Sequence, residues 1–167
     1  MTGLNLIKGL HHNAYRCRDS EETRKFYEDF LGLPLVNAFE ITETKTKRTT
    51  HVLHSFYRMA DGSCLAFFEA PEQPFDFKVQ HDFDLHIALE IPHDDLASWK
   101  AKGQAEGFEV RGIADHHMID SIYFRDPNGY VIELTGKRPN HDDMMDPVKN
   151  DARGHLQRWQ TNKLAGR

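Results

Sequence analysis

Histidine is the residue type most able to carry chemistry in this chain, which holds 11 histidines among 167 residues. An imidazole can ligate a metal ion, and its unperturbed pKa lies near neutral pH, so it can also move protons. Two of the histidines, His12 and His86, lie in short alternating segments, and Glu133 lies in another. Two imidazoles and one carboxylate form a ligand set that binds a divalent cation and leaves coordination positions open.

The elements that must position these side chains are short strands and two helices. In the first half, a strand precedes a helix that Asp19 caps and Gly32 ends, and three strands follow. In the second half, a strand precedes a helix that Pro92 opens and Gly107 ends, and three more strands follow. The expected strands are residues 10–17, 35–44, 49–57, 64–69, 85–91, 108–113, 121–125 and 130–134.

The shared order of elements predicts an internal repeat, with residues 70–81 as the linker between its halves. Alignment of the halves places the His12 segment on the His86 segment, 74 residues later. It also sets Gly62 against Gly129, so that Ala66 becomes the counterpart of Glu133.

Strand alternation assigns each polar side chain to a face of its sheet. Residues 85, 87, 89 and 91 are apolar, which puts His86 on the opposite face. Residues 130, 132 and 134 are apolar too, and this puts Glu133 on that opposite face, as Ile122 and Phe124 do for Tyr123. Taken singly, His12 is compatible with a surface histidine, His86 with a hydrogen-bonded core histidine, and Glu133 with a partner of Arg125. The shared faces and repeat positions favour a joint metal site.

Several motifs resemble the vicinal oxygen chelate superfamily, which includes glyoxalase I, extradiol dioxygenases, methylmalonyl-CoA epimerase and fosfomycin-resistance proteins. The resemblance covers residues 7–136, and its motifs are the runs 12–19, 26–27, 30–33 and 123–129 together with Glu133. It implies an α+β fold in which two paired βαβββ modules form one funnel-shaped, eight-stranded mixed sheet around a metal. It also implies that His12, His86 and Glu133 are the metal ligands.

The superfamily divides on a fourth ligand that glyoxalases and epimerases take from the fourth strand. The counterpart here is Ala66, which cannot bind metal. This departure favours a set resembling that of extradiol dioxygenases, in which a tyrosine precedes the carboxylate ligand by ten residues, as Tyr123 precedes Glu133.

Other residues are assigned to the substrate side of the site. His116, in the Asp115-His116-His117 run, is the candidate proton carrier beside Tyr123. His54, Phe68 and His117 are candidate substrate-binding residues. His51 and His54 lie on opposite strand faces, and the sequence leaves open which one faces the metal. The expected apolar wall consists of Phe39, Phe56, Phe67 and Phe68.

The leading hypothesis is an Fe(II) extradiol-type dioxygenase that cleaves a small catechol-like bidentate substrate with O2. Mn(II), Zn(II), Ni(II) or Co(II) are alternative metals. One alternative is a glyoxalase, isomerase, lyase or thiol transferase that uses such a metal. A second alternative is a metal-free protein that binds a small molecule such as a drug.

Composition and charge restrict the partners and the cellular location that we expect for this protein. The formal net charge is −5 with no basic block, which argues against a nucleic-acid partner. No apolar run is long enough to span a membrane, and residues 1–10 lack a secretory pattern, so we expect a cytoplasmic protein.

Residues 1–145 are expected to form one domain, with modules at about 7–70 and 82–136. Residues 146–167 are expected to add a helix that begins at Asp146 and Pro147, whose apolar stripe packs on the body or on a second subunit of a homodimer.

Overall fold

The computed structural model describes residues 6–79 and 81–164, so residues 1–5 of the N-terminal segment considered above lie outside the described residues. The chain divides into two compact units. The first contains residues 1–85 and 126–130, and the second contains residues 86–125 and 131–167. Whether the two form a single domain stays a prediction.

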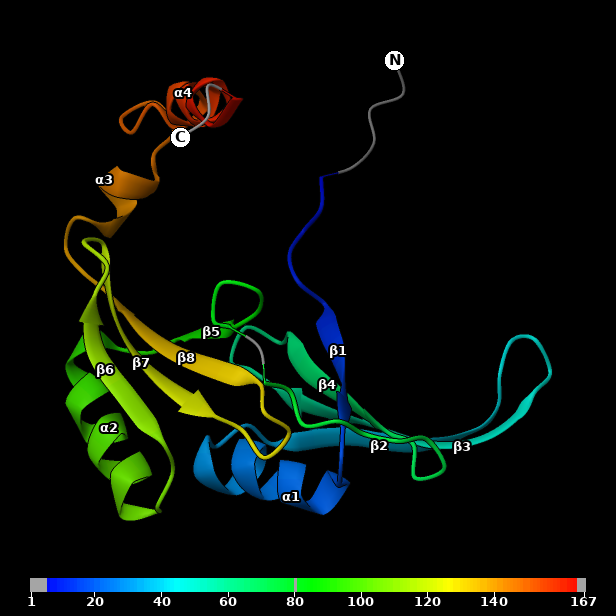
Figure 1. The fold of residues 1–167 in the computed structure, drawn as a ribbon. Helices are drawn as coiled ribbons and strands as arrows, with labels where there is room; N and C mark the ends of the chain where they lie inside the picture. The colour runs from blue at the N-terminus through cyan, green and yellow to red at the C-terminus, as the bar shows by residue number, and fades with distance from the viewer. Residues whose placement is uncertain (1–5, 80, 165–167) are drawn as a thin grey trace. The chain divides into compact units, whose positions relative to one another are not determined.

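The first unit carries a four-stranded mixed sheet with strand order β1-β4-β3-β2 (Figure 1). Strands β1 and β4 are parallel, whereas the β2–β3 and β3–β4 pairs are antiparallel. The elements are β1 (His12–Cys17), α1 (Ser20–Arg24), the π-helical segment η1 (Lys25–Phe30), β2 (Leu35–Glu43), β3 (Thr49–Arg58) and β4 (Cys64–Glu69).

The helix of this unit forms where its capping residue predicts. The Asp19 side chain accepts a hydrogen bond from the backbone N–H of Glu22, which satisfies one of the free donors of the first turn. Phe26, Tyr27 and Phe30 are buried. The Tyr27 ring lies 4.7 Å from the ring of Phe67, which is fully buried. Phe67 therefore belongs to the helix-covered face, and its predicted place in the substrate wall is wrong.

The loop at residues 126–130 belongs to the first unit, where hydrogen bonds to Tyr27, Thr23 and Arg16 hold it, and Asp126 accepts hydrogen bonds from the loop and from Tyr27. The Tyr27 hydroxyl donates to Asp126 Oδ2 at 2.9 Å. The other donors are two backbone N–H groups, at Asn128 and Tyr130, and the side-chain amide of Asn128. Burial raises the pKa of Asp126, and these bonds oppose that effect. The Asp-Pro-Asn-Gly motif is thus explained structurally.

Gly129 in that loop has φ +95°, and a Cβ built there would lie 2.4 Å from the carbonyl oxygen of Lys78. Only glycine combines this backbone conformation with so close an approach.

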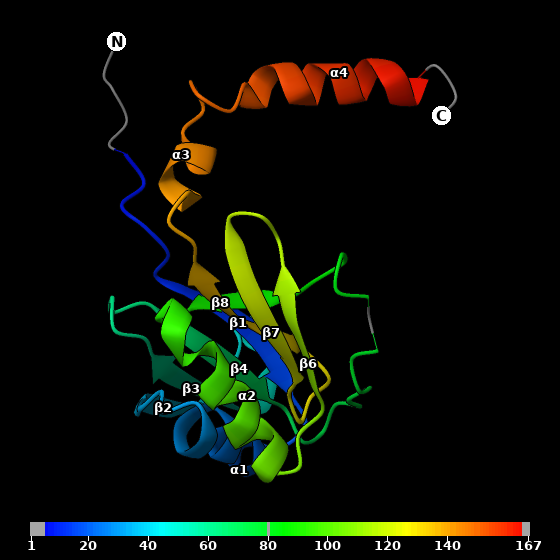
Figure 2. The same ribbon diagram turned by 90° about the vertical axis from the view of Figure 1, so that its left-hand side faces the viewer.

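The second unit carries a mixed sheet with the order β5-β8-β7-β6, with helix α2 on one side of it (Figure 2). Gly103 of α2 lets this helix pack closely, because a Cβ there would meet Cε1 of Phe124 at 2.3 Å. The elements are β5 (Ile87–Glu90), a short 3-10 segment η2 (His93–Asp95), α2 (Leu96–Ala105), β6 (Val110–Asp115), β7 (Ile119–Arg125), β8 (Val131–Lys137), α3 (His141–Met145) and α4 (Ala152–Leu164).

A charged cluster connects η2 and the residue that follows β8 to strand β7 of the second sheet. Arg138 donates to both carboxylate oxygens of Asp120, and His93 Nε2 lies 2.7 Å from Oδ2 of the same residue. The hydrogen bonds from Arg138 and then His93 lower the pKa of Asp120.

The two sheets have the same internal topology, which confirms the predicted repeat of two βαβββ modules and the eight strands of an α+β fold. The register agrees residue by residue: Ala14 pairs with Ala66 in the first sheet, and Ala88 pairs with Glu133 in the second. Ala66 is therefore the structural counterpart of Glu133, as the alignment predicts.

The C-terminal part differs from the expectation. A short helix covers His141–Met145, and the terminal helix begins at Ala152 rather than at Pro147. Val148, Leu156 and Trp159 are 89%, 59% and 65% exposed, so this stripe does not pack on the body of the chain. Packing on a second subunit stays a prediction. Within residues 6–79 and 81–164, no helix is both long and apolar enough to cross a membrane.

Candidate metal centre

Two predicted ligands meet in the second module. Strands β5 and β8 are parallel, and Ala88 pairs with Glu133. His86 lies two residues before Ala88, so alternation places it on the same face, within reach of this carboxylate. His86 Nε2 lies 3.2 Å from Glu133 Oε2. Two donors that each lie about 2.1 Å from one metal ion, at about 90–110° to each other, are roughly 3.0–3.4 Å apart. The observed distance fits two adjacent ligands of a single cation.

Glu133 is unusual because its side chain is only 5% exposed, whereas that of His86 is 41% exposed. Burial of an ionised carboxylate is unfavourable unless hydrogen bonds or a cation compensate it. Nitrogen and oxygen donors of this kind suit Fe(II), Mn(II), Zn(II), Ni(II) or Co(II). The donor chemistry and the burial therefore both fit a divalent metal.

Tyr123 is part of the same group of side chains. It pairs with Glu133 in the β7–β8 ladder, and its hydroxyl donates to Glu133 Oε1 at 3.2 Å. His116 Nε2 lies 2.8 Å from the Tyr123 hydroxyl oxygen. The tyrosine proton points to the carboxylate, so His116 Nε2 carries the proton of the second bond. A continuous chain therefore connects exposed His116 to Glu133 through Tyr123.

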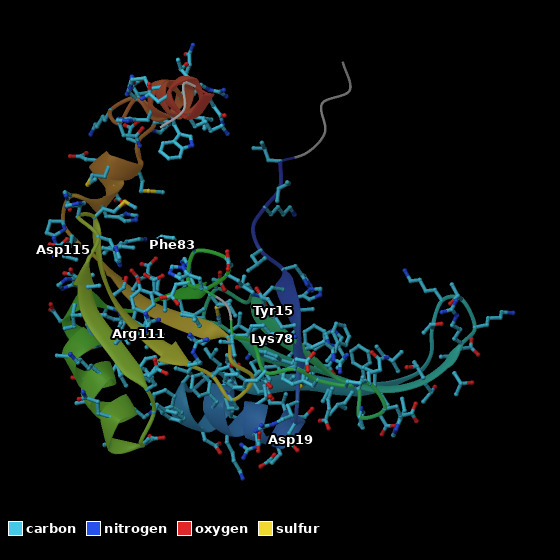
Figure 3. All side chains as sticks on the ribbon, in the orientation of Figure 1. Tyr15, Asp19, Lys78, Phe83, Arg111 and Asp115 are labelled. Atoms are coloured by element: carbon cyan, nitrogen blue, oxygen red, sulfur yellow. The ribbon has the colours of Figure 1, made fainter. Side chains whose placement is uncertain are left out.

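His117 follows His116 in the turn between β6 and β7 and has a positive φ of 68°. The Asp115 carboxylate accepts the backbone N–H of His117 at 2.6 Å, and this bond, followed by one from Arg138, lowers the pKa of Asp115. Figure 3 shows Asp115 at the end of β6 and Arg111 near the start of this strand. The side chain of His117 is exposed, and its predicted contact with substrate stays a prediction.

His12 lies at the start of β1 in the first module, on the sheet face opposite to the helix. Its ring is 5.5 Å from the Phe56 ring and 6.3 Å from the His54 ring. The Nδ1 atoms of His11 and His12 are 2.7 Å apart. His12 is thus accompanied by aromatic rings on an exposed part of its sheet.

His54, and not His51, shares the face of His12. His54 is buried, stacks on Phe68 with ring centroids 3.8 Å apart, and places Nδ1 3.0 Å from the Phe67 carbonyl oxygen. A carbonyl only accepts, so Nδ1 carries the proton and Nε2 keeps its lone pair. The side chain of His51 is 62% exposed and lies 3.4 Å from Glu40.

The predicted three-ligand set spans both units. Among the residues that the structure describes, no three His, Cys, Asp or Glu side chains are grouped closely enough to hold a metal ion. His86 and Glu133 form a pair within the second unit, and His12 belongs to the first. Their joint use as ligands remains a prediction.

Sequence reasoning missed Arg16, which lies two positions beyond Ala14 on the His12 face and lines a cavity there. Alternation from His12 would have found its face. It also missed the contact of Asp120 with Arg138 and His93, for which the sequence contains no local signal.

The family follows from a comparison with known proteins. A family model described as the Glyoxalase/Bleomycin resistance protein/Dioxygenase superfamily matches residues 9–134. This chain belongs to that superfamily. The assignment confirms the family expected from the motifs.

Two proteins similar to this chain differ in the activity that their names state. The chain is 31% identical over 132 residues to the metallothiol transferase FosB of Bacillus licheniformis. This match covers 78% of the chain and 76% of FosB. It is 34% identical over only 55 residues to a putative ring-cleaving dioxygenase, MhqA of Bacillus subtilis, covering 32% of this chain and 17% of that protein. The longer match fits the thiol-transferase alternative and not the extradiol hypothesis.

The solved structure of the fosfomycin resistance protein FosX from Listeria monocytogenes, in complex with Mn(II) and sulfate, has the same fold. Its TM-score is 0.60 at 20% identity, with 82% of this chain and 98% of that chain covered. FosX from Mesorhizobium loti has a TM-score of 0.57 at 21% identity, with 82% and 98% covered.

Proposed function

We propose that this protein is a divalent-metal enzyme that transfers a nucleophile, a thiol or water, to a small electrophile held through two adjacent oxygens. His12, His86 and Glu133 would be the metal ligands. The observation that carries the proposal is the contact of His86 with the nearly buried Glu133 at 3.2 Å, a spacing suited to two ligands of one cation. The long match to a metallothiol transferase supports the choice of reaction over ring cleavage.

A bound divalent metal would supply Lewis acidity and hold the electrophile through its oxygens. Tyr123 fixes one oxygen of Glu133 and so orients the carboxylate toward His86. When an oxygen of the substrate gains negative charge, the Tyr123 hydroxyl gives up its proton, and His116 Nε2 replaces that proton. Because His116 is exposed, it exchanges protons with the solvent.

On the first module, His54 and Phe68 would bind the organic part of the substrate. Their stacked rings present an apolar surface, and the lone pair on His54 Nε2 can accept one hydrogen bond. Phe39 and Phe56 extend this surface, with ring centroids 5.4 Å and 4.2 Å from that of His54.

The test is metal analysis combined with an epoxide assay. Protein stripped with a chelator is reloaded with Mn(II), Ni(II), Co(II), Zn(II) or Fe(II), and the bound metal is counted. Each form is then given fosfomycin with L-cysteine, cysteamine, glutathione or water alone, and the products are followed by phosphorus NMR. We expect one metal per site and metal-dependent opening of the epoxide. Purified protein without stoichiometric metal and without reaction would contradict the proposal and favour a metal-free binding protein.

A second candidate is the Fe(II) extradiol dioxygenase. It is favoured by Tyr123, which lies ten residues before Glu133 and bonds to it, and by the short match to MhqA. Anaerobic Fe(II) loading, addition of a catechol panel and exposure to O2 distinguish the two candidates. Oxygen uptake with a yellow ring-opened product supports this candidate, and no uptake with any catechol rejects it.

A further inference from the structure

A cavity of about 300 Å³ lies in the first module on the same sheet face as His12 and His54. Its apolar lining includes Ile41, Val52 and Phe68. Strand pairing places Ile41 opposite Val52, and it places Phe68 between Arg16 on β1 and His54 on β3. The cavity therefore continues the aromatic surface around His54 toward the β2–β3 hairpin, which extends beyond β4 (Figure 1).

Among the described residues, the polar lining of this cavity consists of one cation, Arg16, together with Thr44, Thr50 and Gln73. The Arg16 guanidinium donates to the Gln73 side-chain oxygen at 3.0 Å, to the Gln73 carbonyl at 3.3 Å and to the Ala70 carbonyl at 3.5 Å. These acceptors are all neutral. Its Nε is buried and has no acceptor among the described residues.

Arg16 is therefore a positioned charge without a counter-charge. Among residues 6–79 and 81–164 it forms no ion pair, whereas neighbouring Arg18 is paired with Glu22. A partly buried guanidinium held by neutral groups gains most from an anionic oxygen group, because charge-assisted bonds are stronger than bonds between neutral groups. Apolar walls beside it favour a ligand that carries carbon next to that group.

We propose that this cavity binds a small organic carboxylate, with the carboxylate at Arg16 and the carbon chain against Phe68, Ile41 and Val52. Arg16 lies four residues from His12 along one strand, which corresponds to about 13 Å. A two- or three-carbon electrophile at His12 would not span that distance. The next step rests on the proposed transfer reaction. If that reaction is correct, the carboxylate at Arg16 belongs to the thiol co-substrate.

The first experiment measures binding without requiring activity. Calorimetry compares 3-phenylpropionate with its neutral amide on the wild-type protein, on Arg16→Gln and on Arg18→Gln, the matched control. We expect the wild type and the control to prefer the carboxylate by about 10-fold to 100-fold, and Arg16→Gln to lose this preference. Equal affinity for both probes, no binding of either, or a preference that survives in Arg16→Gln would overturn the proposal.

Arg16 also holds the segment at Ala70 and Gln73, so Arg16→Gln has to be checked for folding by thermal unfolding. Should that variant not fold, amide NMR of the wild type decides the question. Carboxylate-dependent shifts must centre on Thr50, Val52 and Phe68, and shifts elsewhere contradict the site.

The second experiment tests the co-substrate role. In the transfer assay, Arg16→Gln should raise KM for L-cysteine by about 10-fold to 100-fold while leaving KM for cysteamine, which lacks the carboxylate, unchanged. Equal effects on both thiols contradict that role. Absence of transfer with every thiol contradicts the proposed function, and the binding experiment still decides the cavity by itself.

Discussion

The two modules have the same strand order and the same register, yet they present different chemistry at equivalent positions. In the second module, Ala88 pairs with Glu133, whose carboxylate is buried. In the first module, the equivalent Ala14 pairs with Ala66, which has no carboxylate. The first module instead carries the ring stack of His54 and Phe68 and the charge of Arg16. The two modules thus share strand order and register while the side chains on their helix-free faces differ.

This difference has a chemical consequence for the proposed metal site. A carboxylate in both modules would fill a further coordination position, whereas an alanine in one leaves that position to a substrate. The functional asymmetry therefore resides in residues on the helix-free faces of the sheets, because residues on the opposite faces are constrained by packing against the helices.

The largest effect is expected when the carboxylate of the second module is removed. Glu133→Gln keeps the shape but not the charge, and it should abolish stoichiometric metal and lower activity at least about 1000-fold. Metal analysis and the transfer assay measure this. Glu90→Gln is the matched control, since Glu90 lies in the same module, is 60% exposed and pairs with Lys137. Retention of full metal by the Glu133 variant would remove Glu133 from the ligand set.

A carboxylate added to the first module should make the two modules more alike. Ala66→Glu is expected to slow metal loss to a chelator and to lower activity about 10-fold to 100-fold, by occupying the position left for substrate. Ala66 is fully buried, so Ala66→Gln serves as the control for overpacking. If both variants behave alike, the effect is steric and the register argument fails.

The hydrogen-bonded chain of the second module has no equivalent by sequence in the first. Tyr123→Phe and His116→Gln should each lower kcat about 10-fold to 100-fold, and the double variant should be little worse than either single variant because they act in one chain. The measurement is kcat against pH for the three variants. His51→Gln is the control, because the His51 side chain is 62% exposed and lies outside the proposed site. Additive losses would show that the two residues act separately.

The smallest effect concerns the charged anchor of the second module. The pKa of Asp120 is lowered in the folded state, so its stabilisation is complete above the unfolded pKa of about 3.9 and is lost as the pH falls through the lower folded value. Asp120→Asn should lower Tm by roughly 2–8 °C at pH 7, and the difference should shrink in strong acid. Tm measured against pH tests this prediction, and a difference that is constant with pH would contradict it.

Much of the fold followed from local patterns. The Asp19 cap, the glycine at the end of each helix and the two-residue alternation of β5 and β8 depend on neighbours in the chain, and each agrees with the structure. The assignment of Phe67 to the substrate wall failed because Phe67 and Phe68 are adjacent and occupy opposite faces, and an isolated pair of apolar residues does not show which one a helix covers. The terminal helix began later than expected because the Asp146 side chain caps the N–H of Val148 in a turn rather than in a helix.

The amino-acid sequence by itself determined the two-module plan, the superfamily and the faces on which His86, Tyr123 and Glu133 lie, because these depend on spacing along one strand or on a repeated pattern. Only the tertiary structure decided that His116 reaches Tyr123, that His54 rather than His51 joins the His12 face, and that Arg16 lines a cavity with no ion-pair partner among the described residues. Those contacts join residues of different strands and turns, and their distances depend on side-chain packing that no local pattern encodes.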